Sequence, residues 1–281
     1  MTNGDPADVS GSNMAAVDTS DDPQARVNYL DAAGSQSIDM KVNSYSTLGI
    51  NGGYKVLDVG CGAGDDVRRM AAIVGPFGRA VGLDSSETMI AQARERSAGL
   101  DLPVEFVLGS AYELPFSDDS FDACRCERVL QHLDQPLAAI GEMLRVVRPG
   151  GRVLLLDPDF GTGVLDTSHP ELHERVRALG QNWRRMQPGS GWRGRQLWAL
   201  AHQAGLEDVE VEGIVLTITA FAPANAMAGI DSRTAAAVEA GVISQEEADA
   251  YLDDLRERDA TNRFFSGVAG FQVVGTVPAK G

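Results

Sequence analysis

Cysteine is scarce in this chain of 281 residues, and long apolar runs and a basic leader are missing. The three cysteines are an odd number in a chain that is not small, so we expect no disulfide framework. No apolar run reaches the roughly 18 residues of a membrane-spanning helix. The N-terminus lacks the basic and apolar segments of a secretion signal. Together these absences favour a cytoplasmic protein with no membrane partner.

Basic residues are also few, with 24 Lys and Arg against 40 Asp and Glu and a net charge of −16. A chain this acidic is repelled by nucleic-acid phosphates and by anionic membrane surfaces. We therefore expect no nucleic-acid partner. Residues 1–23 are polar and contain five Asp but no Lys or Arg, which predicts a disordered acidic tail. Residues 24–281 are predicted to form a single domain.

Strands alternate with helices over residues 53–157, the pattern of βαβ units around a parallel sheet. One helix is predicted at 65–74 and another at 136–147, the second ending at a Pro-Gly-Gly stop signal. Short β-branched and apolar segments predict strands at 55–59, 79–84, 104–108, 121–125 and 153–156.

The pattern changes after residue 157. A helix at about 170–180 lies within a stretch rich in Gly, Pro, Trp and Arg, and a helix and a strand follow it. The Ala-rich residues 224–266 are predicted to be helical and to precede a last strand at 271–277. Ser244 and Glu247 have the spacing of a capping box that opens one of these helices.

These elements predict a doubly wound α/β fold with a mostly parallel seven-stranded sheet, a helical lid and a helical insertion between the last two strands. Its expected parts are N-terminal helices at 24–52, a cofactor-binding core at 53–157, and a substrate lid from 158–192 and 221–266.

A glycine-rich turn follows the first predicted strand, with glycines at Gly60, Gly62 and Gly64 and a helix immediately after them. Glycines let the backbone turn sharply and approach a ligand closely. Twenty residues later the second strand ends in Asp84, where a carboxylate can accept hydrogen bonds from both ribose hydroxyls. The structural alternatives are that Gly62 is only a tight turn and Asp84 only a helix cap, but together they do not explain the order and spacing of these residues.

The charge around this turn argues against a dinucleotide. Asp58 precedes the turn, and Asp65 and Asp66 open the helix, so a pyrophosphate at that helix N-terminus would meet carboxylates. A ligand with a cationic amino group suits the site better. S-adenosylmethionine carries an ammonium and a sulfonium and has no phosphate.

Five segments together resemble the class I S-adenosylmethionine-dependent methyltransferases, in the branch related to ubiquinone and menaquinone methyltransferases. The segments occur in the family's order at 56–64, 80–89, 109–116, 121–133 and 144–151. The resemblance implies S-adenosylmethionine as cofactor. It implies a cofactor site formed by Asp58, Gly60, Cys61, Gly62, Gly64, Asp84, Ser85, Met89, Ser110, Ala111 and Glu127.

Ser110 departs from the family pattern, which usually has Asp at this position to accept from the adenine amino group. A serine hydroxyl also accepts, but more weakly. The departure leaves open an enzyme that binds the cofactor and catalyses a non-methylating reaction such as cyclisation or decarboxylation. A third reading is a binding module without catalysis, although the intact glycine and Asp84 motifs argue against it.

His132 is the catalytic candidate. It follows the fourth predicted strand, at the carboxyl edge where ligands bind in such sheets, and histidine suits general-base chemistry near neutral pH. The alternatives are that it lines the cofactor or only packs. His169 and His173 share a helix face and can in principle bind a metal with nearby acids, but an ordinary polar surface also explains the pair. We expect no metal.

The substrate is expected to be a small, largely apolar metabolite methylated on oxygen or carbon, in specialised biosynthesis such as that of antibiotics. The strand-four motif of enzymes that methylate nucleic-acid amino groups is missing at 124–127. The oligomeric state is not indicated. Aromatic residues outside the core either line the pocket or pack the lid: Tyr29, Tyr45, Trp183, Trp192, Phe221, Phe264 and Phe265.

Overall fold

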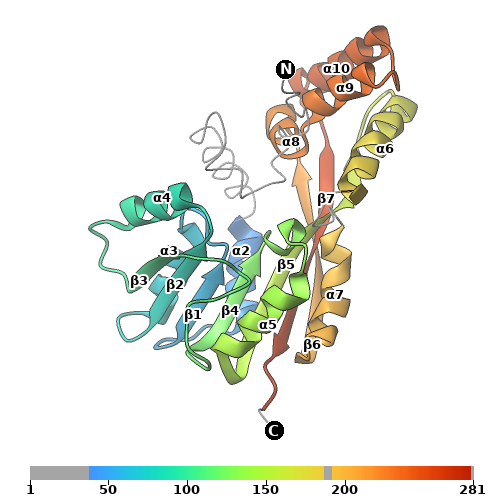
Figure 1. The fold of residues 1–281 in the computed structure, drawn as a ribbon. Helices are drawn as coiled ribbons and strands as arrows, with labels where there is room; N and C mark the ends of the chain where they lie inside the picture. Colours follow the sequence, from blue (N-terminus) through green and yellow to red (C-terminus); the bar gives the residue numbers. More distant parts are fainter. Residues whose placement is uncertain (1–37, 187–191, 280–281) are drawn as a thin grey trace, which may run out of the picture.

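The protein is built on a seven-stranded mixed sheet with the strand order β3-β2-β1-β4-β5-β7-β6 (Figure 1). The computed structural model describes residues 38–186 and 192–279, and the side chains of 43–179 and 192–279. The predicted doubly wound α/β class is confirmed. The strands are β1 (Lys55–Val59), β2 (Arg79–Asp84), β3 (Val104–Leu108), β4 (Phe121–Glu127), β5 (Val147–Leu165), β6 (Glu207–Ile218) and β7 (Ser266–Thr276).

Strands β1 to β5 pair in parallel, and β7 runs antiparallel to both β5 and β6. Val56 and Leu57 of β1 point to opposite faces and are both fully buried, because helices cover both faces of the sheet. The helices of the two layers are α2 (Ile38–Leu48), α3 (Asp65–Val74) and α4 (Glu87–Ser97) on one face, and α5 (Pro136–Val146) and α7 (Arg193–Gln203) on the other.

Strand β5 is much longer than the four residues that the sequence predicts, and β7 begins five residues before its predicted start. The sequence signal for β5 covers only its apolar centre. Pro158, Gly161 and Gly163 favour a turn locally, yet this segment continues β5 beside β7, with a register shift between Asp159 and Val164. Cross-strand hydrogen bonding overrides the local preference here, so residues 158–165, predicted as lid, belong to the sheet.

The long ends of β5, β6 and β7 carry a helical lid beyond the carboxyl edge of the sheet (Figure 1). The predicted insertion between the last two strands is confirmed, as is the capping box of Ser244 and Glu247. Ile218, Phe221 and Tyr251 belong to the lid's own apolar cluster. The lid helices are α6 (Pro170–Met186), α8 (Phe221–Ala228), α9 (Ile230–Glu239) and α10 (Gln245–Ala260).

The predicted acidic tail at 1–23 and residues 24–37 of the predicted N-terminal helices lie outside the described residues. Among the helices that the structure describes, none has the length and apolar character needed to cross a membrane.

Candidate functional site

The candidate site lies at the carboxyl edge of the sheet, where the strand order reverses. β1 has β2 on one side and β4 on the other, so the chain leaves β1 and β4 in diverging directions. Open α/β sheets bind ligands in the crevice at this position. The loops that meet there follow β1, β2 and β4, and they contain most of the residues that the sequence analysis singled out.

The three glycines after β1 all have positive φ angles, of 77° at Gly60, 52° at Gly62 and 79° at Gly64, but they differ in surroundings. A Cβ on Gly60 would lie 2.1 Å from Val129, and one on Gly64 would lie 2.5 Å from the Phe106 ring. A Cβ on Gly62 would meet nothing within 4 Å. Gly60 and Gly64 therefore permit close packing, and Gly62 leaves open space above the turn.

Asp84 joins the end of β2 to this turn. Its Oδ2 accepts from the Gly62 amide at 2.9 Å and its Oδ1 accepts from the Ser86 amide at 2.9 Å. The helix cap is Ser86, whose hydroxyl accepts from the Met89 amide at 3.2 Å, while Ser85 is exposed. A carboxylate has about four lone-pair positions, so Asp84 can fix the turn and still accept from hydroxyl donors.

A buried group of charged side chains lies between β1 and β4. Arg125 of β4 is 1% exposed, and its Nη1 lies 3.1 Å from Oδ1 of Asp58 and 3.6 Å from Oδ2 of Asp66. Its Nη2 pairs with Glu127. The Tyr45 hydroxyl donates to Asp66. We call these five residues the Arg125 cluster.

The three carboxylates set the protonation state of this cluster. Burial by itself lowers the pKa of Arg125, but Glu127, Asp66 and Asp58 outweigh burial and raise that pKa well above its usual value. Burial, reinforced by the charge of Asp66, also raises the pKa of Tyr45. Arg125 is therefore charged and Tyr45 neutral at all physiological pH values.

The other predicted cofactor residues differ in accessibility. Cys61 is 8% exposed and its side chain lies over Gly82, so it belongs to the core. Met89 is 1% exposed. Ser110 is exposed, and its hydroxyl accepts from the Tyr112 amide at 3.1 Å. Ala111 is partly buried against the core. The site thus combines buried supporting residues with exposed positions at the loop after β3.

The catalytic candidate His132 and the two cysteines of β4 differ in burial. His132 ends the short 3-10 helix η3 (Leu130–His132) after β4 and is partly buried at the carboxyl edge. Cys124 and Cys126 are fully buried on one sheet face. Burial raises the pKa of both thiols.

One of the two candidate histidines and two of the candidate aromatic residues pack within the lid. Nδ1 of His173 lies 2.9 Å from the Tyr251 hydroxyl, and burial lowers the pKa of His173. Phe221 and Phe264 pack edge to face with ring centres 5.9 Å apart. These residues hold the lid together. Tyr29 and the Trp183 side chain lie outside the described parts of the chain.

Two acids within β5, Asp157 and Asp159, are fully buried. Neither oxygen of Asp157 forms a hydrogen bond of normal geometry among the described residues, although the Gln131 backbone is close enough to oppose the rise of its pKa. Burial raises the pKa of Asp157 well above its usual value, although Arg193 opposes the shift. Asp159 instead accepts from the Arg195 guanidinium at 2.8 Å and from the Gly161 amide at 2.9 Å.

Asp157→Asn is expected to be at least as stable as the wild type near pH 8. The unfolded chain ionises this aspartate above about pH 4, whereas the folded chain retains the proton to a higher pH. The contribution of Asp157 to stability is therefore full below about pH 4 and falls as the pH rises. Asparagine abolishes this fall. Thermal unfolding at about pH 5 and about pH 8 measures the change.

Asp159→Asn is the matched control, because it is equally buried on the same strand but paired. Loss of the Asp159 charge is expected to lower the free energy of unfolding by about 1–2 kcal/mol. The cost is limited because the half-exposed Arg195 guanidinium can be hydrated by water instead. Equal destabilisation by both substitutions at about pH 8 would show that Asp157 has a hidden partner.

Comparison with known proteins places these features in a family. A family model described as a methyltransferase domain matches residues 50–222. An uncharacterized 37.1 kDa protein in transposon TN4556 of Streptomyces fradiae is 36% identical over 250 residues, which are 88% of this chain and 70% of that protein.

Two further comparisons cover the core and the fold. A demethylmenaquinone methyltransferase of Staphylococcus aureus is 41% identical over 110 residues, or 39% of this chain, and the match spans only 45% of that enzyme. The solved structure of the [4+2]-cyclase SpnF has a TM-score of 0.53 at 20% identity, covering 86% of this chain and 82% of that one. At that identity the likeness shows the fold alone.

Proposed function

The chain belongs to the methyltransferase domain family, and from this membership we propose that it transfers the methyl group of S-adenosylmethionine to a small, largely apolar metabolite. The observation that carries the proposal is the pairing of Asp84 with the Gly62 amide at the carboxyl edge of the sheet. A carboxylate fixed beside an open glycine turn suits a nucleoside with free ribose hydroxyls. The proposed setting is specialised, natural-product metabolism in the cytoplasm.

The residues around the turn fit this cofactor. Asp84 retains acceptor capacity for the ribose, and the space above Gly62 admits a ligand against the backbone. The acids of the Arg125 cluster suit a cationic amino group and disfavour a pyrophosphate. Ser110 and Ala111 border the adenine in this proposal, with Met89 beneath it. When bound, S-adenosylmethionine supplies an electrophilic methyl group on a sulfonium.

His132 is the proposed general base. It ends the η3 segment that follows β4 at the carboxyl edge of the sheet. A neutral imidazole there accepts the proton of a hydroxyl, a phenol or an acidic carbon as that atom is methylated. Much of the remaining rate enhancement comes from holding the accepting atom at attack distance, which the lid and the η3 segment would provide.

The function is tested by turnover of the purified protein with S-adenosylmethionine and a panel of phenolic and other hydroxylated metabolites. Mass spectrometry measures the products. The expected result is one S-adenosylhomocysteine for each methylated product. A changed metabolite without S-adenosylhomocysteine would instead favour the alternative, a cyclisation or decarboxylation. Failure to bind S-adenosylmethionine in calorimetry would overturn both.

A further inference from the structure

The strand order determines which end of the cofactor meets the Arg125 cluster. The loop after β3 carries the adenine residues, and the ribose acid Asp84 ends the adjacent β2. The glycine turn follows β1, and the cluster lies between β1 and β4. A ligand whose adenosine lies over β3 and β2 therefore extends its amino-acid end toward the cluster. This placement depends on the proposed function.

Arg125 lies at the centre of the cluster that faces the amino-acid end of the cofactor, but its side chain is buried. The guanidinium bridges Asp58 of β1 and Glu127 of β4. Both lie on the same face of the sheet, and Glu127 is two residues further along its strand than the residue paired with Asp58. Arg125 and Asp58 are paired neighbours across the two parallel strands. Without a cation between them, these buried carboxylates and Asp66 would repel one another and lose their positions.

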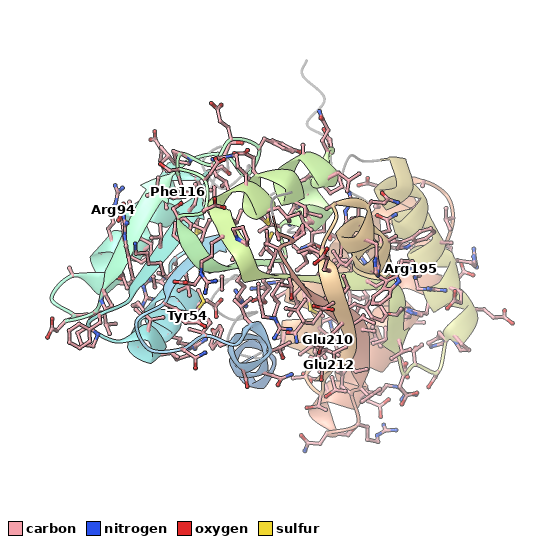
Figure 2. The ribbon with its side chains drawn as sticks, turned by 90° about the horizontal axis from the view of Figure 1, so that it is seen from below. Tyr54, Arg94, Phe116, Arg195, Glu210 and Glu212 are labelled. Carbon is pink, nitrogen blue, oxygen red and sulfur yellow. The ribbon has the colours of Figure 1, made fainter. Side chains whose placement is uncertain are left out.

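Helix α2 closes the cluster from outside with Ser44 and Tyr45. The preceding residue, Asn43, instead donates to Glu212 of β6 at 3.0 Å, and Figure 2 labels Glu212. The Ser44 hydroxyl accepts from Nε of Arg125 at 3.1 Å. The Tyr45 ring lies 5.5 Å from the Arg125 guanidinium carbon. The guanidinium thus has its planar face covered and its nitrogens bonded in three directions, which is the geometry that distinguishes arginine from lysine.

We propose that Arg125 is a positioning residue for the amino-acid end of the cofactor. Its fork holds the carboxylates of Asp58 and Glu127 at the carboxyl edge, where they attract the ammonium group, and Ser44 of α2 holds the fork. Arg125 itself does not contact the ligand. The charge of the residue and the shape of its fork both matter, and lysine preserves only the charge.

Two probes separate this role from general support of the fold. S-adenosylhomocysteine has the amino-acid end, whereas 5′-methylthioadenosine has the same adenosine without it. In calorimetric titrations, Arg125→Lys is expected to weaken the binding of S-adenosylhomocysteine about tenfold. The affinity for 5′-methylthioadenosine is expected to change by less than about twofold. Ser44→Ala, a milder change that loses one hydrogen bond, is expected to weaken S-adenosylhomocysteine about threefold only.

Arg148→Lys is the matched control. Its guanidinium pairs with Asp122 at 2.7 Å, at the opposite end of β4. The affinity for either probe should therefore stay unchanged. Equal weakening of both probes by Arg125→Lys, or unchanged S-adenosylhomocysteine binding by both Arg125→Lys and Ser44→Ala, would overturn the proposal. Wild-type protein that binds neither probe would overturn the cofactor site itself, and a thermal unfolding curve for each variant identifies any that fails to fold.

Discussion

Replacing Asp84 with alanine is expected to weaken the binding of S-adenosylmethionine by at least about tenfold, or about 1.4 kcal/mol. The substitution removes the acceptor proposed for the ribose hydroxyls. It also releases the Gly62 and Ser86 amides, which Asp84 now holds at 2.9 Å each, so the glycine turn loses its fixed shape. Isothermal titration of wild type and variant gives the two dissociation constants.

Two further variants separate the causes of the Asp84→Ala effect. Asp84→Asn retains one acceptor oxygen, and we expect its affinity to lie between the wild type and the alanine variant. Glu105→Ala removes a carboxylate from the neighbouring strand β3, where it pairs with Arg79 in an exposed ion pair. That change should leave the affinity unaltered. If Asp84→Ala bound as tightly as the wild type, the ribose would have to lie elsewhere.

Gly60→Ala is expected to destabilise the fold by about 2–5 kcal/mol. About 1–2 kcal/mol comes from a non-glycine residue in the left-handed region, and about 1–3 kcal/mol from overpacking. The overpacking arises because the new Cβ would lie 2.1 Å from a methyl group of Val129. Urea denaturation of the ligand-free protein measures the free energy of unfolding.

Gly62→Ala is the matched comparison on the same turn. Its φ is also positive, but its Cβ would meet nothing within 4 Å, so only the conformational strain of about 1–2 kcal/mol is expected. The Cβ would enter the space proposed for the cofactor, so binding should suffer more than stability. Equal losses of stability in the two variants would show that Val129 moves aside without cost.

Local patterns in the sequence were sufficient for the first half of the sheet. The bounds of β1, β2, β3 and α3 are the predicted ones, because a glycine, Pro103 or the Ser86 helix cap interrupts the apolar periodicity near each end. The capping box at Ser244 was equally readable, since its two partners are three residues apart. Each of these features depends on residues close together in the chain.

The Arg125 cluster was not predictable in this way. Asp58 and Glu127 were predicted to be cofactor residues. The fully buried arginine that pairs with both of them was not predicted. The one signal available was an arginine within the buried stretch of β4, where a charge requires a partner. Apart from Glu127 on the same strand, its partners come from α2, β1 and α3, between 59 and 81 positions away in the sequence.

The two buried acids of β5 show the same limit of prediction from sequence. Asp157 and Asp159 are two residues apart on one strand and look alike in the sequence, yet among the described residues only Asp159 forms an ion pair, with Arg195 of α7. Composition, periodicity and turn chemistry by themselves determined the fold class, the glycine turn and the acid that follows it. Strand register and helix docking alone decided which buried charges are paired, because those contacts join residues that are distant in the chain.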